Sequence, residues 1–121
     1  WHMNGEVILG DQRGRKNGFP TANLEPGYHI LPLKGVYCVY AFIDGKQHNA
    51  IANFGERPTV DGTKLLLETH IFNFNRDIYG KELTVEFLTF IRDEQKFENF
   101  DKLTQQIHQD IQTAKNYHLK K

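Results

Sequence analysis

The segment Gly35–Ile43 constrains the fold more than any other part of the chain. It reads GVYCVYAFI, and its β-branched and aromatic residues on both alternating faces predict a strand. Asp44 and Gly45 follow directly and form a strong signal for a two-residue hairpin turn, with residues 46–54 as the returning strand. We therefore expect an antiparallel hairpin whose first strand has a barrel interior on one side and a helix on the other.

Further strand signals precede the first convincing helix. Segments 65–74 and 82–91 are long strand candidates, and the stretch NRDIYGK between them predicts a second hairpin. Residues 6–9 are a candidate for a short first strand. Apolar residues recur at spacings of three and four over residues 100–114, which predicts an amphipathic helix capped by Asn99 or Asp101. Strands without alternating helices favour an antiparallel barrel or sandwich covered by the terminal helix.

Length and composition exclude several classes of protein. A chain of 121 residues is the size of one domain, and 15 basic against 15 acidic residues give no net charge to attract nucleic acid or an anionic membrane. Cys38 is the single cysteine, which excludes a disulfide framework and fits a reducing cytoplasm. No stretch has the length of a membrane helix. We expect residues 1–4 to be a cloning remnant or a domain boundary, and residues 5–121 to form the domain.

The stretch GRKNGFPTANLEP contains the first candidate site. Pro20 favours extended backbone around it, so Thr21 and Asn23 point to the same side. A hydroxyl and a carboxamide oxygen suit Mg²⁺, which often takes one or two protein ligands and completes its shell with water and substrate phosphates. The preceding loop 10–18 offers glycines and cations to phosphate groups. The alternative is an ordinary turn and surface loop, since neither G-x-x-x-x-G-K-[ST] nor G-x-G-x-x-G is present.

The segment LLLETHIFNF contains a second candidate, Glu68. Strand alternation places this carboxylate in a largely apolar row with His70. Apolar surroundings favour the neutral acid, which is the tuning that a general base near neutral pH needs. The alternative is a solvated face, or a Glu68 that simply pairs with His70 or a lysine.

Three other residues are weaker candidates. Arg57 lies in NFGERPTV, which predicts a Gly/Pro turn, and we expect it to be a structural anchor. Arg92 and Phe97 follow the last strand and are suited to lining a planar ligand, although such aromatic residues more often belong to a core.

Several motifs, taken in order, resemble the riboflavin kinase family. They are GRKNGFPTANL, GVYCVYAFI, AIANFGERPTV, LETHIFNFNRDIYGKELTVEFLTFIR and FDKLTQQIHQDIQTA. The resemblance covers nearly the whole chain, with P-T-A-N as its most specific element, and it is greatest to the kinase module of bacterial bifunctional FAD synthetases. It implies a mainly β fold, a six-stranded antiparallel Greek-key barrel with a long C-terminal helix packed against it. It also implies the reaction of ATP and riboflavin to give ADP and FMN.

The resemblance also implies roles for individual residues. Thr21 and Asn23 would hold Mg²⁺ and the nucleotide phosphates, and Glu68 would bind riboflavin and act as base on the ribityl 5′-hydroxyl. Arg92 and Phe97 would approach the flavin. The implied ATP-binding set is Gly10, Gly14, Arg15, Lys16, Pro20, Thr21 and Asn23. Asn17 departs from the leucine that is common in the family.

The implied partners are riboflavin or FMN and ATP or ADP, with no nucleic acid and no membrane. The resemblance to the bifunctional enzymes also implies an FMN adenylyltransferase module as a partner in a longer parent chain. A non-catalytic flavin- or nucleotide-binding barrel is the alternative function, and Glu68 favours the enzyme, because a protein that only binds has no need of a base.

Overall fold

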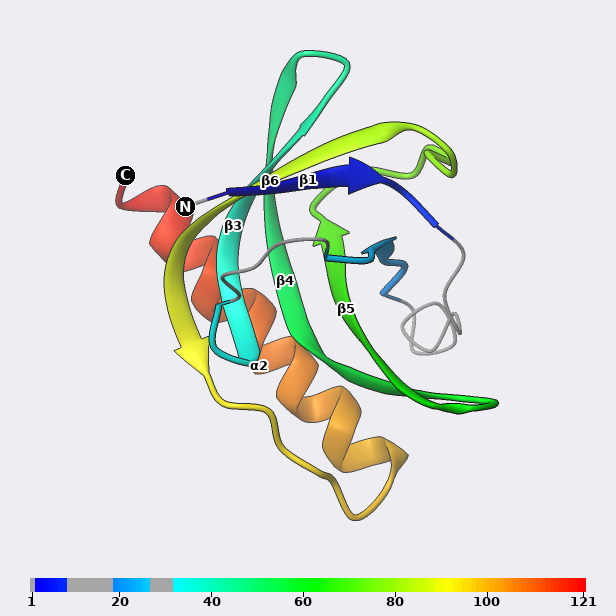
Figure 1. Ribbon diagram of the computed structural model, residues 1–121. Coiled ribbons are helices and arrows are strands. Elements are labelled where there is room, and N and C mark those ends of the chain that lie inside the picture. Colours follow the sequence, from blue (N-terminus) through cyan, green and yellow to red (C-terminus); the bar gives the residue numbers. More distant parts are fainter. Residues whose placement is uncertain (1, 9–18, 27–31) are drawn as a thin grey trace.

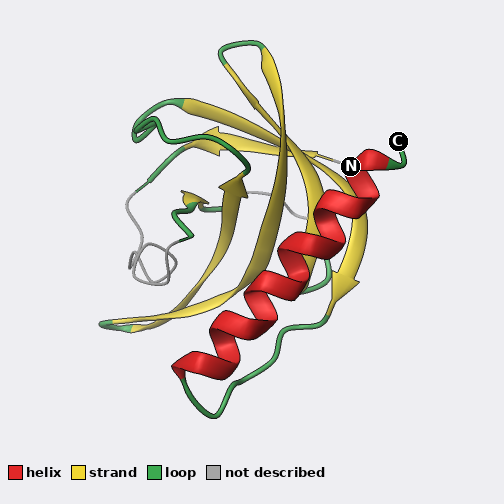
Figure 2. Ribbon diagram, turned by 180° about the vertical axis from the view of Figure 1, so that it is seen from behind, coloured by secondary structure: helices red, strands yellow, loops and turns green. Residues whose placement is uncertain are grey.

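Six antiparallel strands curve into a nearly closed barrel, and one long helix packs on its outer surface (Figures 1 and 2). The computed structural model describes residues 2–8, 19–26 and 32–121. The strands are β1 (His2–Glu6), β2 (Ala22–Leu24), β3 (Gly35–Ile43), β4 (Lys46–Thr59), β5 (Gly62–Ile71) and β6 (Glu82–Arg92), and the helix is α2 (Phe100–Leu119).

The sheet runs in the order β1-β6-β3-β4-β5-β2, so its two edge strands are β1 and β2. Just past the end of β1, the amide of Ile8 donates to the carbonyl of Asn23 in β2 at 2.9 Å, which brings the two edges together. The predicted antiparallel barrel with a terminal helix is confirmed.

The strand β3 is buried on both faces, as its composition predicts. Tyr37, Val39, Ala41 and Ile43 belong to the core inside the barrel. Val36 and Cys38 face the other way and pack in a second cluster with Ala114 of α2. The helix begins where predicted, because the side chain of Asn99 accepts a hydrogen bond from the Lys102 amide at 2.9 Å.

The predicted Gly/Pro turn at residues 53–60 is wrong. These residues continue β4 to Thr59, and the strand turns into β5 only at residues 60–61. The pairing of β3 with β4 ends at Phe54, so Pro58 lies on a free edge of β4 and is exposed. A proline has no amide to donate to a neighbouring strand, and it is tolerated at such an edge.

Two further expectations are corrected. The segments 65–74 and 82–91 do not form a hairpin, because β5 pairs with β4 and β2 whereas β6 pairs with β3 and β1. The first strand is His2–Glu6, in which Met3 is completely buried, and it ends before Val7 and Ile8 of the predicted range 6–9; Leu9 lies outside the described residues. Among the helices of the described residues, none has both the length and the apolar character needed to cross a membrane.

Candidate functional site

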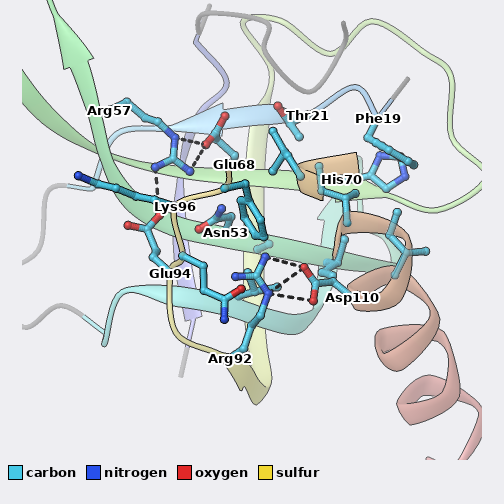
Figure 3. A pocket seen from close by; sticks show the side chains of 18 of the residues that line it. Phe19, Thr21, Asn53, Arg57, Glu68, His70, Arg92, Glu94, Lys96 and Asp110 are labelled. Carbon is cyan, nitrogen blue, oxygen red and sulfur yellow. Dashed lines mark hydrogen bonds and ion pairs between the residues drawn. The ribbon is translucent and has the colours of Figure 1, made fainter. Parts of the chain in front are cut away.

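A cavity of about 730 Å³ lies between the outer face of the barrel and the beginning of α2 (Figure 3). We call it the outer cavity. Strand alternation decides which residues reach it. Leu67 and Ile71 of β5 belong to the core inside the barrel, so Glu68 and His70 point outward and line the cavity.

Three polar residues form a row across this outer face. Glu68 is the register partner of Asn23 on β2 and of Asn53 on β4. Residues directly opposite each other in an antiparallel pair point to the same face, with Cβ atoms about 5 Å apart. A carboxylate is therefore flanked by a carboxamide on each side.

Both carboxamides of this row have a buried oxygen that could accept a hydrogen bond or bind a cation. The Oδ1 atoms of Asn23 and Asn53 are buried and lack a hydrogen-bond partner in the part of the chain that the structure describes. A buried polar atom without a hydrogen bond lowers the stability of the folded protein. Such atoms therefore suggest that an ion or a ligand binds there.

A second cavity of about 570 Å³ lies on the other side of β2, and we call it the mouth cavity. The residues that line it include Asn23 of β2, Thr69 of β5, and Arg76 and Tyr79 of the segment between β5 and β6. Thr21 lines both cavities. The segment around Thr21 and Asn23 thus forms a shared wall between two spaces.

Glu68 forms a close ion pair with Arg57 of β4. The Nε and Nη2 atoms of Arg57 both lie 2.6 Å from Oε1 of Glu68, and the two side chains are only 13% and 11% exposed. Arg57 also contacts Glu94 at 3.1 Å. Burial opposes the charge of Arg57, but the two carboxylates outweigh it and raise the pKa of the guanidinium.

This ion pair corrects the expectation of an apolar environment for Glu68. A cation at hydrogen-bond distance stabilises the ionised carboxylate, which acts against the effect of apolar neighbours. Arg57, which the sequence predicts to be a structural anchor, bridges Glu68 and Glu94 and also lines the outer cavity (Figure 3).

Neighbouring contacts fix the segment before β2. The ring nitrogen Nδ1 of His70 lies 2.9 Å from the carbonyl oxygen of Pro20. The ring of Phe19 packs edge to face against His70 and against His108 of the helix. Phe19 thus packs between β5 and α2, two residues before Thr21.

At the far side of the outer cavity, Arg92 is held by Asp110 of α2. Its Nε atom lies 3.0 Å from each carboxylate oxygen, and its Nη2 atom lies 2.7 Å from Oδ2. The guanidinium carbon of Arg92 lies 5.8 Å from the ring centre of Phe97, which comes from the loop between β6 and α2. Arg92 and Phe97 line the cavity together.

Comparison with known proteins decides the family. The sequence profile of the riboflavin kinase family (Flavokinase) matches residues 1–118. This chain belongs to the riboflavin kinase family.

Individual relatives agree. A Haemophilus influenzae protein named bifunctional riboflavin kinase/FMN adenylyltransferase is 46% identical over 118 residues, which are 97% of this chain and 38% of that protein. The RNA-binding riboflavin kinase RibR of Bacillus subtilis is 43% identical over 95% of this chain and 50% of its own length. A crystal structure described as a macrolide-efflux protein from Streptococcus pneumoniae has a TM-score of 0.86 and 39% identity, covering 95% of this chain and 38% of that one.

The chain thus spans half or less of the length of these relatives. The name RibR attaches RNA binding to a member of the family, so the expectation of no nucleic-acid partner stays a prediction.

The structure brings together many of the residues expected for this riboflavin kinase family member, whose roles remain predictions. Glu68, Thr21, Arg92 and Phe97 line the outer cavity, while Pro20 and Asn23 line the mouth cavity. Four of the expected ATP-binding residues lie outside the described residues: Gly10, Gly14, Arg15 and Lys16.

Sequence reasoning missed three residues of this site. Asp110 had a usable signal, because it is an acid on the buried face of an amphipathic helix, between Ile107 and Ala114. Asn53 and Glu94 had none, since their places depend on the pairing of β4 with β5 and on the path of the loop after β6.

Proposed function

We propose that this chain transfers the γ-phosphoryl group of ATP to the ribityl 5′-hydroxyl of riboflavin, giving FMN and ADP. Membership of the riboflavin kinase family supports the reaction. The observation that carries the assignment of the site is the row in which Glu68 lies next to Asn23, with a cavity on the same face. The adenylylation named for the Haemophilus protein belongs to that protein and is not part of the proposal.

The two cavities suit the two substrates. The outer cavity combines aromatic and aliphatic residues with six charged ones, and its volume of about 730 Å³ falls in the range of small-molecule sites. We assign it to riboflavin, with Phe97 and Arg92 as parts of its wall. The mouth cavity receives the nucleotide, because Asn23 and the cation of Arg76 lie there. Transfer then takes place at the shared wall around Thr21.

Thr21 and Asn23 fit a magnesium ion. The buried and unpartnered Oδ1 of Asn23 is a hard oxygen of the kind that Mg²⁺ prefers. Groups of three or more His, Cys, Asp or Glu that could hold a metal are absent from the described residues, which agrees with an ion that relies on substrate phosphates for its remaining ligands. When bound, the ion neutralises charge on the transferred phosphoryl group.

Glu68 performs the proton transfer in this proposal. The 5′-oxygen of riboflavin forms a bond to the γ-phosphorus, the bond from that phosphorus to the bridging oxygen of ADP breaks, and the hydroxyl proton passes to the Glu68 carboxylate. A proton acceptor must be ionised before the reaction, and the ion pair with Arg57 favours that form of the carboxylate.

The test is the conversion of riboflavin to FMN with ATP and Mg²⁺, followed by separation of the two flavins. General-base catalysis contributes about a hundredfold to ten-thousandfold, and we expect Glu68→Gln to lose turnover by that factor while it keeps ADP affinity. Asn23→Ala should also weaken Mg²⁺-dependent ADP binding measured by calorimetry. Glu82→Gln is the matched control, since Glu82 is exposed and lies outside the residues that line either cavity.

Two results would contradict the proposal. Flavin and nucleotide binding without any FMN formation by the wild-type chain would indicate the alternative, a non-catalytic binding barrel. Undiminished turnover in Glu68→Gln would remove the assignment of the base.

A further inference from the structure

Arg57 joins the base to a loop that comes from a distant part of the sequence. Its Nη1 atom lies 3.1 Å from Oε1 of Glu94, in the loop 93–99 between β6 and α2. Its other nitrogen atoms contact Glu68, as described above. One guanidinium therefore holds a carboxylate of the barrel wall and a carboxylate of the loop, as the dashed lines in Figure 3 show.

The barrel has a shaped place for Glu94. Gly55 and Arg57 are two residues apart on β4 and thus share its outer face. A Cβ atom added at Gly55 would meet the carboxylate of Glu94, whose three terminal atoms are its nearest neighbours. The loop side chain therefore lies in a notch that only glycine leaves open, next to the cation that binds it.

The loop held in this way is a wall of the proposed flavin site. Glu94, Lys96 and Phe97 line the outer cavity from the loop. The loop is fixed to the helix at both ends, by the Arg92–Asp110 ion pair and by the Asn99 cap. The contact of Glu94 with Arg57 instead fixes the first part of the loop to β4, the strand that neighbours the base.

We propose that Arg57 is a positioning residue that orients Glu68 and, through Glu94, holds the loop 93–99 against the flavin. The inference rests on the proposed function, in which Glu68 is the base and the outer cavity takes riboflavin. The proposal gives the Arg57 side chain two separate effects on catalysis. Loss of the Glu68 contact disturbs proton transfer and lowers kcat, whereas loss of the Glu94 contact loosens the flavin wall and raises the KM for riboflavin.

Steady-state kinetics of FMN formation test this separation. Misplacement of a reacting group by about 1 Å costs about a hundredfold in rate, so we expect Arg57→Gln to lower kcat about tenfold to a hundredfold and also to raise the riboflavin KM. Glu94→Gln and Gly55→Ala should raise the riboflavin KM about threefold to tenfold, the effect of one ordinary hydrogen bond, because the Glu94 side chain is partly exposed; kcat should stay within about twofold of wild type. The KM for ATP should stay unchanged in all of them, since these residues lie away from the mouth cavity.

Two further variants sharpen the result. In the Arg57→Gln background, Glu94→Gln should have no additional effect on the riboflavin KM, because the contact that it removes is already lost. Arg57→Lys keeps the charge but cannot bridge both carboxylates with a fixed fork, and it should retain more of kcat than Arg57→Gln. Glu56→Gln is the control, since Glu56 is the exposed neighbour on the same strand and pairs with Lys34 outside the outer cavity.

Several results would overturn the inference. The first is a kcat of Arg57→Gln equal to that of wild type, and the second is additive effects of Arg57→Gln and Glu94→Gln on the riboflavin KM. The third is that the KM values for riboflavin and for ATP both change in the variants, in proportion to the loss of stability measured in urea. Absence of FMN formation by the wild-type chain would count against the proposed function instead, so the two failures are distinguishable.

Discussion

The ion pair between Arg92 and Asp110 makes a quantitative prediction about how α2 is held on the barrel. Its side chains are 16% and 5% exposed, and three nitrogen–oxygen distances lie between 2.7 and 3.0 Å. Asp110→Asn removes the negative charge and leaves the guanidinium buried. Breaking a buried pair in this way costs about 3–5 kcal/mol. We expect about 3 kcal/mol, because Arg92 keeps its 2.9 Å contact with the Asp93 carbonyl and the new amide retains one oxygen acceptor.

Urea unfolding followed by circular dichroism measures this loss. For a chain of 121 residues, about 3 kcal/mol corresponds to a decrease in Tm of about 10 °C. Asp101→Asn is the matched control, since this exposed residue in the first turn of the same helix contributes only a helix-dipole effect of about 0.5 kcal/mol. The double variant Asp110→Leu/Arg92→Met should recover much of the loss, because neither charge remains buried.

A small effect would refute this reasoning. If Asp110→Asn and Asp101→Asn differ by less than about 1 kcal/mol, the pair behaves like an exposed one, and Arg92 is then accessible to water in solution. Its place in the wall of the proposed flavin site would need revision.

Two further predictions concern α2 and β3. Asn99→Ala should lower the free energy of unfolding by about 1 kcal/mol, because it removes the cap of α2, whereas Asn99→Asp should retain it; equal urea midpoints for Ala and wild type would contradict this. Burial raises the pKa of the Cys38 thiol from 9.0 to about 11, with Lys121 opposing, so at about pH 8 iodoacetamide should label the thiol in urea but not in the native protein. The folded thiol keeps its proton to a higher pH than the unfolded one. The stability that Cys38 contributes is therefore fully present below pH 9 and is lost as pH rises to about 11. Fast labelling of the native protein would contradict the burial of this thiol.

The parts of the fold that depend on local pattern could be predicted from the sequence. Gly35–Ile43 has apolar residues on both faces, and the structure buries both faces. The helical spacing after Asn99 likewise gives α2. The pairing of β3 with β4 was also predictable from the Asp44-Gly45 turn, but the pairing of the later strands was not. A short connection between two strands suggests a hairpin. However, β5 and β6 do not pair with each other, and each pairs with strands that precede it in the sequence.

The candidate site shows the same division. Thr21 and Asn23 share a face because extended chain alternates, which is a local property. That Glu68 lies beside Asn23, and that Arg57 reaches it, depends on the pairing of three strands. No local pattern contains that information. The sequence therefore indicated only that Arg57 is an anchor in a turn, although the residue lines the outer cavity.

The register of β2 against β5 is what makes a site out of these residues. Ala22 and Leu24 alternate with Asn23 and are buried in the barrel core, with 8% and 1% of their surface exposed. A slip of one residue would turn Leu24 outward at a cost of about 1.5–3 kcal/mol and would point Asn23 away from Glu68, since every side chain of the strand changes face. The apolar residues of this three-residue strand therefore set the position of a polar one. The core of the barrel, and not a contact within the site, fixes where the proposed metal ligand lies relative to the base.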